Sequence, residues 1–173
     1  MNILTNDPSF TAWGWAVVSS AYNKIRETGC IKTAPEQNKR RIRASDDRTR
    51  RAADIVQELL RIIRKYDIKM IISEAPHGSQ NAQAAIMIGM VAGITTAISE
   101  CLDIPIEYYA EADSKKAILG KRAATKSDMI EAIDKLYEVD WKSIKYIDEA
   151  VADALAVHYV ATKQSQMLKM MKK

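Results

Sequence analysis

Two acidic residues of this sequence each follow directly on a short apolar run. Asp7 comes after residues 2–6 and Glu74 comes after residues 69–73, and both runs have the composition of buried β-strands. If these strands are parallel neighbours, their carboxyl ends meet at one edge of the sheet, where ligands of open sheets usually bind. The sequence therefore predicts that Asp7 and Glu74 share a site at that edge.

A third group of acids lies near the C-terminus, on a helix expected over residues 148–162. Glu149 and Asp153 are four residues apart and therefore lie on one face of that helix, and Asp148 stands at its start. Small apolar residues flank Asp153, a setting in which a carboxylate is rarely buried without a partner. This helix is the natural source of further acids for the same site.

Carboxylates that converge repel one another by about 4 kcal/mol per pair at about 4 Å and an effective dielectric constant of about 20. Such a cluster is stable when protons or cations neutralise it, and hard oxygen ligands suit Mg²⁺ or Mn²⁺. Two such ions about 4 Å apart activate water and stabilise the leaving oxygen in phosphodiester hydrolysis. Simpler interpretations stay open: Asp7 as a turn residue, Glu74 as a strand exit, and Glu149 as a favourable charge at a helix N-terminus.

The length of 173 residues fits one compact domain. We expect this domain over residues 1–162, followed by a basic C-terminal tail over residues 163–173. Cys30 and Cys101 lie far apart, which argues against a disulfide scaffold or a structural zinc site and suits a reducing cytoplasm. The first ten residues have no charged start followed by an apolar run, so we expect no signal peptide and a cytoplasmic location. We also expect no small-molecule cofactor.

The net charge of +4 is unevenly distributed along the chain. Residues 163–173 carry four lysines and no acid, residues 39–51 carry seven basic and two acidic residues, and residues 115–126 carry five basic residues and no acid. Each such segment can be a solvated face. Two basic segments together with a basic tail favour a polyanionic partner such as nucleic acid.

The hydrophobic patterns predict ten elements of secondary structure in the order β-β-β-α-β-α-β-α-α-α. The strands are expected over about residues 2–6, 11–19, 22–33, 69–73 and 104–109, and the helices over about residues 45–66, 81–101, 113–119, 125–137 and 148–162. Three successive strands followed by alternation predict an α/β fold with a five-stranded mixed sheet flanked by helices.

Two of the expected helices have informative patterns. In the first, Ala53, Val56, Leu60 and Ile63 recur at helical spacing and predict its buried face. The second lies in residues 75–99, which carry no charge and are small and weakly apolar. Because a membrane span is normally more strongly apolar, we expect a buried helix of a soluble fold and no membrane association.

Four motifs follow one another along the chain. They are ILTNDPSFTAWGWAVV with its Asp-Pro turn, SEAPHGSQNAQAAIMIGMVAG with a Glu and an Asn seven residues later, ILGKRAATKSDMIEAI, and ADALAV in the last helix. This ordered set resembles the RuvC family of Holliday-junction resolvases, in the ribonuclease H-like superfamily, over most of the chain. The family has a Gly between the Pro and the Ser of the first motif, which this chain lacks.

The resemblance implies a ribonuclease H-like fold, with three antiparallel strands followed by two parallel ones. It also implies four catalytic acids that bind two Mg²⁺ ions, which Mn²⁺ can replace. Asp7, Glu74 and Asp153 match the family's positions directly.

The fourth acid departs from the family's pattern. The family has an acid or a His three residues before the last Asp, where this chain has Ala150. We expect Glu149, four residues before Asp153, to be the fourth metal ligand and a catalytic residue, with Asp148 as the alternative.

The resemblance further implies that the chain binds four-way DNA junctions. Lys126 is expected to act as a catalytic cation near the scissile phosphate, although it could also be an exposed lysine at a helix start. His77 could stack on a base or merely fill a turn. The DNA contacts that we expect come from Ser9, His77, Asn81, Lys121, Arg122 and Lys126.

Gly89 and Gly93 lie four residues apart on the small-residue helix, which in this family contributes to a homodimer interface. Close packing against the sheet within one chain is the alternative. A four-way junction has near two-fold symmetry, so two sites on a dimer can nick two opposed strands. We therefore expect a Mg²⁺-dependent crossover junction endonuclease.

Two other functions stay open at this stage. One is a related nuclease that acts on other branched DNA or on an RNA–DNA hybrid. The other is a non-catalytic junction-binding protein that has lost its second metal because Ala150 replaces a ligand.

Overall fold

A computed structural model describes residues 1–20, 24–37, 42–121, 123 and 125–171 of the chain. Its element order agrees with the predicted one and adds a short helix at the end. The elements are β1 (Asn2–Asp7), β2 (Ala12–Ser19), β3 (Lys24–Lys32), α1 (Ala44–Tyr66), β4 (Ile68–Glu74), α2 (Ala82–Leu102), β5 (Ile106–Tyr109), α3 (Glu111–Leu119), α4 (Lys126–Asp134), α5 (Lys145–Gln164) and α6 (Gln166–Met171).

The five strands form one mixed sheet in the order β3-β2-β1-β4-β5. β1 pairs antiparallel with β2 and parallel with β4, β2 pairs antiparallel with β3, and β4 pairs parallel with β5. The predicted sheet of three antiparallel and two parallel strands is therefore confirmed. β1 and β4 lie next to each other in the interior of the sheet, so their carboxyl ends are neighbours.

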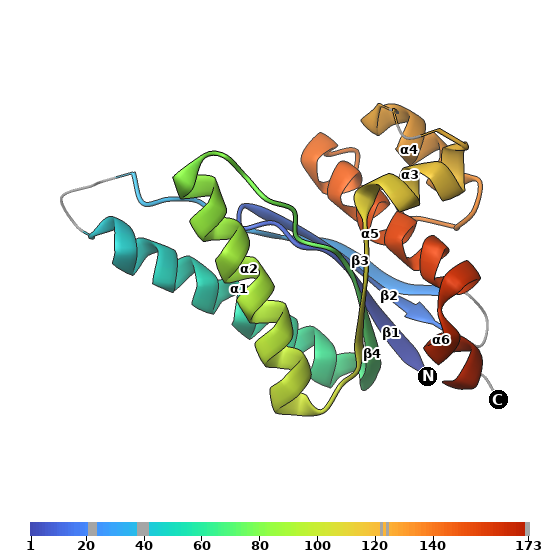
Figure 1. The fold of residues 1–173 in the computed structure, drawn as a ribbon, viewed down its shortest axis with the longest axis horizontal. Helices are drawn as coiled ribbons and strands as arrows, with labels where there is room; N and C mark the ends of the chain where they lie inside the picture. Colours follow the sequence, from blue (N-terminus) through green and yellow to red (C-terminus); the bar gives the residue numbers. More distant parts are fainter. Residues whose placement is uncertain (21–23, 38–41, 122, 124, 172–173) are drawn as a thin grey trace.

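Helices cover both faces of this sheet, with a different set of helices on each face (Figure 1). α1 and α2 pack on one face, where Leu4 of β1 and Ile71 of β4 join the core. α5 and α6 lie on the other face, against Ile3 and Ile72. Since side chains alternate between the two faces of a strand, the odd positions of β1 and the even positions of β4 point toward α5.

Helix α1 buries only part of the predicted face. Of the predicted residues, Ile63 is buried, Val56 and Leu60 are half-buried and Ala53 is exposed. The other buried apolar residues of the helix are Ile55, Leu59 and Ile62. Apolar residues occupy several neighbouring rows of this helix, so spacing alone does not choose between rows about 100° apart. Packing against the sheet makes that choice.

The C-terminal half differs in its boundaries from the predicted elements. α4 ends at Asp134 rather than at residue 137, and α5 begins at Lys145, one turn before the predicted start. Residues 163–171, expected as a basic tail, complete α5 and form α6. Leu168 of α6 is 2% exposed and packs with Ile3 and Val157.

Helix α5 lies unusually close to the sheet at Gly14 of β2. A Cβ atom added to Gly14 would lie 2.1 Å from the backbone oxygen of Ala150 and 2.8 Å from its Cβ. One turn further along the helix, the Thr5 hydroxyl of β1 donates a buried hydrogen bond of 2.6 Å to the carbonyl oxygen of Ala154. Glycine at position 14 therefore allows α5 to reach the central strands.

Replacement of Gly14 tests this packing. We expect Gly14→Ala to lower the free energy of unfolding by about 3 kcal/mol, because the new methyl group meets the backbone of α5, which cannot yield as a flexible side chain can. Urea unfolding followed by circular dichroism measures the change. Gly78→Ala is the matched control, because an added Cβ at Gly78 meets no atom within 4 Å. Equal stabilities of the two variants would contradict the prediction.

Candidate active site

Asp7 and Glu74 end two neighbouring parallel strands and lie at the same edge of the sheet. Asn6 pairs with Ser73, so the two acids occupy the next row of the β1–β4 ladder. Both belong to the strand positions that alternate toward α5, together with Ile3 and Ile72. The predicted meeting of these two carboxylates at one sheet edge is therefore what the strand register produces.

Asp153 reaches the site from α5 and forms an ion pair with Lys126, the first residue of α4. The side chain of Asp153 is 9% exposed and that of Lys126 is 47% exposed. A capping box holds the start of α4: the Thr125 hydroxyl accepts from the Asp128 N–H at 3.2 Å, and the Asp128 carboxylate accepts from the Thr125 N–H at 3.0 Å. This cap fixes the point from which Lys126 extends to Asp153.

The three carboxylates act on one another electrostatically. Burial, followed by the negative charge of Asp153, raises the pKa of Asp7 to about 7. Burial and then the charges of Asp7 and Asp153 raise the pKa of Glu74 to about 8. Burial also raises the pKa of Asp153, although the hydrogen bond from Lys126 opposes this change. Without a cation, the site therefore holds protons near neutral pH.

Glu111 adds a fourth acid that the sequence argument missed. Its charge raises the pKa values of Asp7, Glu74 and Asp153, in each case less than burial does. Glu111 begins α3 and follows β5, the parallel neighbour of β4. The rule that selected the first two acids, an acid just beyond the carboxyl end of a parallel strand, applies equally to Glu111.

The two further acids predicted on α5 have different surroundings. Asp148 is buried, and its carboxylate accepts a hydrogen bond of 2.9 Å from the backbone N–H of Lys142, so it ties down the chain before α5. Glu149 is half-buried, one helical turn before Asp153. The charges that act most strongly on Asp153 are those of Lys126 and Glu111. A metal-binding role for Glu149 or Asp148 stays a prediction.

The chemistry of the donor set fits a hard divalent cation. Asp7, Glu74 and Asp153 offer carboxylate oxygens, the ligands that Mg²⁺ and Mn²⁺ prefer, and their repulsion favours a cation between them. Among the described residues, no three His, Cys, Asp or Glu side chains converge closely enough to bind a metal ion as they stand. Asp153 must exchange its ion pair with Lys126 for the cation.

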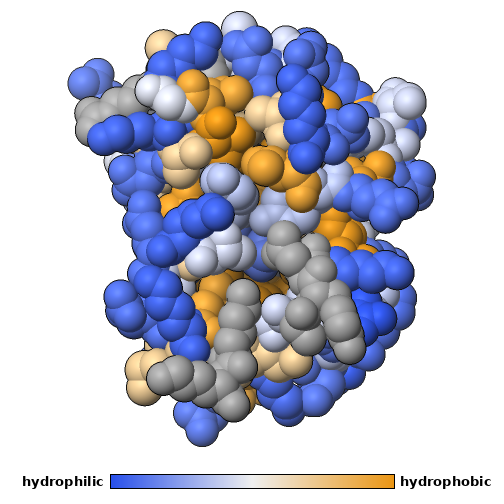
Figure 2. Space-filling model, turned by 90° about the vertical axis from the view of Figure 1, so that its right-hand side faces the viewer, coloured by the Kyte–Doolittle hydropathy of each residue, from blue (hydrophilic) through white to orange (hydrophobic). Residues whose placement is uncertain are grey.

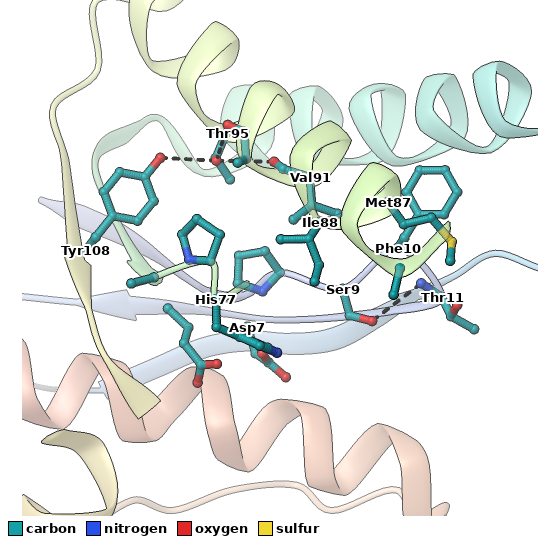
Figure 3. Close-up of a pocket in the computed structure, with 16 residues that line it drawn as sticks. Asp7, Ser9, Phe10, Thr11, His77, Met87, Ile88, Val91, Thr95 and Tyr108 are labelled. Carbon is teal, nitrogen blue, oxygen red and sulfur yellow. Dashed lines mark hydrogen bonds between the residues drawn. The ribbon is translucent and has the colours of Figure 1, made fainter. Parts of the chain in front are cut away.

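A cavity of about 270 Å³ opens beside Asp7 and Glu74, between the β1–β2 turn, the β4–α2 segment and α2 (Figure 3). Its walls are mostly apolar, and Tyr108 donates a hydrogen bond of 3.1 Å to Thr95 at one end. Two of the predicted DNA-contacting residues, Ser9 and His77, line it. Hence Asp7 and Glu74 have an apolar recess next to them on the side of α2.

The structure also shows the local surroundings of Ser9, Asn81 and Lys121, three of the predicted DNA contacts. Ser9 Oγ accepts weak hydrogen bonds from Thr11 and Ala12 within the turn after β1. Asn81 is exposed and caps α2, its side chain accepting from the Ala84 N–H at 3.0 Å. Lys121 is exposed in the segment between α3 and α4. Arg122 lies outside the described residues.

A comparison with known families and proteins agrees with this arrangement. The family described as crossover junction endodeoxyribonuclease RuvC matches residues 3–160 of the chain.

The chain belongs to the RuvC family. A RuvC from Ehrlichia canis is 26% identical over 160 residues, which cover 92% of this chain and 97% of that protein. A RuvC from Pseudothermotoga lettingae is 29% identical over 159 residues, 91% of each chain. The matches extend from β1 into α5, so they include all three segments that carry the acids. The protein is thus a member of a family of metal-dependent junction endonucleases.

Solved structures give the same fold. Thermus thermophilus RuvC in complex with a Holliday junction substrate has a TM-score of 0.71 and 18% identity, and the alignment covers 99% of this chain and 97% of that one. The yeast mitochondrial Holliday junction resolvase has a TM-score of 0.64 and 11% identity, covering 98% and 81%. At these identities the likeness is evidence for the ribonuclease H-like fold.

The raised pKa values predict how the stability of the metal-free protein depends on pH. The folded chain holds protons on Asp7 up to about pH 7 and on Glu74 up to about pH 8, whereas the unfolded chain loses them near pH 4. The folded state therefore binds more protons in this window, and the free energy of unfolding falls as the pH rises from about 4 to about 8.

Asp7→Asn tests this dependence, because it removes one of the repelling charges. In excess EDTA at about pH 8.5, we expect the free energy of unfolding of the variant to exceed that of the wild type by about 1–3 kcal/mol. Near pH 4 we expect little difference between the two proteins. Urea unfolding at both pH values measures this. Asp54→Asn on the exposed face of α1 serves as control. A destabilising effect of Asp7→Asn at the higher pH would contradict the charge argument.

Proposed function

We propose that this protein is a Mg²⁺-dependent endonuclease that resolves four-way DNA junctions by paired symmetric nicks. The observation that carries the proposal is the family match over residues 3–160, a span that includes Asp7, Glu74 and Asp153, three acids that act on one another electrostatically. This arrangement suits the binding of two divalent cations, with Mn²⁺ as a substitute for Mg²⁺.

In this proposal Asp7, Glu74 and Asp153 hold the cations and fix their position against the scissile phosphodiester. The bound cations supply an activated water and stabilise the leaving oxygen. Partial burial of the carboxylates strengthens each electrostatic contact. Asp7 and Glu74 end two strands of the sheet and Asp153 lies in the middle of α5, so the acids are positioned before substrate arrives.

Lys126 has a second role in the proposal. Burial lowers its pKa, but the hydrogen bond and charge of Asp153 outweigh burial, so the ammonium stays protonated. When Asp153 binds a cation instead, the ammonium becomes free to approach a non-bridging phosphate oxygen. A cation there stabilises the negative charge that develops during hydrolysis. In this proposal Lys126 forms an ion pair with Asp153 in the metal-free protein and stabilises the charge on the phosphate in the DNA complex.

The DNA is proposed to enter across the edge of the sheet that carries the acids. Ser9 and His77 line the cavity beside Asp7, where they can contact the unpaired centre of a junction. Lys121 and Arg122, between α3 and α4, fit contacts to phosphates, which fix position without reading sequence. The side of the molecule that carries the C-terminal helices combines hydrophilic side chains with smaller hydrophobic patches (Figure 2). A DNA substrate and two free cysteines agree with a cytoplasmic location.

We propose a homodimer through α2. By length and composition this helix could cross a membrane, but Val91, Ile94 and Ile98 pack it against the core. Its other face is an exposed stripe of uncharged residues, here called the α2 stripe: Ala82, Ile86, Gly89, Gly93, Thr96 and Ala97.

The sequence left two explanations for Gly89 and Gly93: a homodimer interface, or close packing against the sheet within one chain. Close packing within one chain would need glycine where a Cβ has no room. Added Cβ atoms at Gly89 and Gly93 meet no atom within 4 Å, so the single chain does not require glycine at either position. Close packing of a second helix across the α2 stripe would explain why glycine stands at both positions. A two-fold axis at this contact suits two active sites on one junction.

Junction cleavage tests the catalytic part of the proposal. We expect the wild type with Mg²⁺ to make paired nicks in a labelled synthetic four-way junction. Asp7→Asn should lower the cleavage rate by at least about 100-fold, because one ligand of the cations is lost, while junction binding in EDTA is retained. Asp54→Asn, at an exposed position on α1, should cleave like the wild type.

Three other results would overturn parts of this proposal. Tight junction binding without cleavage in Mg²⁺ or Mn²⁺ would indicate a non-catalytic binding protein. Preferred cleavage of an RNA–DNA hybrid would indicate a different nuclease. Equal binding of junction and duplex, compared over a range of salt concentrations, would refute the junction as substrate.

Gly93→Leu tests the dimer. An added Cβ at Gly93 meets no atom of the single chain within 4 Å and the position is exposed, so we expect the fold to be retained while the leucine side chain holds a second α2 helix away. We expect the variant to sediment as a 19.4 kDa monomer while the wild type sediments as a dimer. Gln57→Leu, at an exposed position on α1, should stay dimeric. A dimeric Gly93→Leu variant would mean that the interface lies elsewhere.

A further inference from the structure

We propose that Arg51 of α1 is a positioning residue of the active site, which holds the turn that follows Asp7. The inference rests on the proposed junction cleavage. Arg51 ends the basic segment of residues 39–51, for which the sequence left two roles open, a solvated face or a contact with a polyanion. Neither role suits Arg51 itself, because this residue is 5% exposed.

The turn between β1 and β2 joins the catalytic acids to the cavity beside them. Its residues 8–11 follow Asp7 directly and line that cavity (Figure 3). Within the turn, Ser9 Oγ accepts from the N–H groups of Thr11 and Ala12 at 3.4 and 3.5 Å, which is long for a hydrogen bond. The conformation of the turn therefore depends on contacts from outside it.

Arg51 supplies such contacts from α1. Its Nε–H donates to the Thr33 hydroxyl at 2.9 Å, and its Nη2 donates to the Phe10 carbonyl oxygen at 3.2 Å. A longer bond of 3.4 Å reaches the Thr11 hydroxyl. The guanidinium also lies over the Phe10 ring, with Cζ 4.5 Å from the ring centroid. One side chain therefore contacts both the backbone of the turn and an aromatic ring of the cavity wall.

Thr33, just after β3, completes the support of the turn. Its hydroxyl donates to the Phe10 carbonyl oxygen at 2.5 Å, and its N–H donates to the Thr11 carbonyl oxygen at 3.0 Å. The same hydroxyl accepts from Arg51, so the contacts form one chain of hydrogen bonds. Because hydrogen bonds are electrostatically stronger away from water, these buried bonds tie the turn to α1 and to the end of β3.

A purely stabilising role for Arg51 is the competing explanation. In the part of the chain that the structure describes, no carboxylate forms an ion pair with this buried cation. Asp47, one turn earlier on α1, bonds instead to Arg50 and to the Glu36 N–H. Well-packed apolar side chains often stabilise a buried position as well as charged groups do. Stability alone therefore does not account for a guanidinium here, whereas its directed hydrogen bonds suit the fixing of a turn.

The position of the turn bears on cleavage through the residues at its start. Asp7 immediately precedes the turn, and Ser9, a predicted DNA contact, lies within it. A displacement of about 1 Å near the reacting groups can slow a reaction by about 100-fold. The proposed phosphate contacts between α3 and α4 do not involve the turn. Loss of Arg51 should therefore slow cleavage while junction binding is retained.

Single-turnover cleavage of a four-way junction at saturating enzyme tests the inference, together with junction affinity in EDTA. We expect Arg51→Met to cleave at least about tenfold more slowly than the wild type and to keep its affinity. Arg51→Lys keeps the charge but not the set of directed bonds, and should be equally slow. Arg61→Met is the matched control, because Arg61 is 49% exposed on the same helix, and should cleave like the wild type.

Hydrogen exchange of the backbone N–H groups of residues 9–12 gives a readout that a general loss of stability does not move. We expect faster exchange in Arg51→Met. Thr33→Val is a second, milder variant, because it removes the hydroxyl between Arg51 and Phe10, and it should show both effects to a smaller extent. Ile62→Val, a core change further along α1, should leave exchange and cleavage unchanged.

Several results would contradict this inference. Wild-type cleavage by Arg51→Met would mean that the turn needs no such support. Restored cleavage in Arg51→Lys would assign the effect to the charge rather than to the directed bonds. Equal effects in Arg51→Met and Ile62→Val would indicate a structural role alone. A wild type that cleaves no junction would overturn the proposed function, and unchanged exchange of residues 9–12 in Arg51→Met would overturn the positioning role independently.

Discussion

The close contact between helix α5 and the sheet is the constraint on which the site depends. Gly14 leaves room for the backbone of Ala150, and the Thr5 hydroxyl binds the carbonyl oxygen of Ala154. These two contacts flank Asp153 along the helix. Because β1 carries Thr5 as well as Asp7, the same strand fixes the helix and supplies one of the acids. The distance between the acids is therefore set by backbone packing, which is stiffer than side-chain packing.

This packing brings together charges that oppose folding. Burial and mutual repulsion raise the pKa values of Asp7 and Glu74 into the neutral range. The ionised acids therefore lower the free energy of unfolding of the metal-free protein. Two lysines offset part of the repulsion, Lys126 on Asp153 and Lys115 on Glu111. A site that is unfavourable without its cations binds them more strongly, because binding relieves the repulsion.

The sheet and the shared edge of Asp7 and Glu74 were accessible from sequence because both follow from local patterns. Short apolar runs and β-branched or aromatic residues located the strands, and an acid directly after each of two parallel strands indicated Asp7 and Glu74. Helical spacing gave less. It placed Glu149 on the same face as Asp153, and a metal-binding role for Glu149 stays a prediction. Glu111 was missed because it stands two residues beyond β5 rather than directly after the strand, although the strand-end rule extends to it.

Helix α2 shows the same limit in another form. Its run of small uncharged residues is compatible with a membrane span, a buried helix or a helix–helix interface, because each of these tolerates such a composition. The burial pattern separates the faces: Val91, Ile94 and Ile98 face the core, while Gly89 and Gly93 face open space. Glycines that cost helix stability without any packing need within the chain call for a partner outside it. The α2 stripe and the acids lie on different faces of the molecule, so a dimer through α2 leaves both sites accessible to one junction.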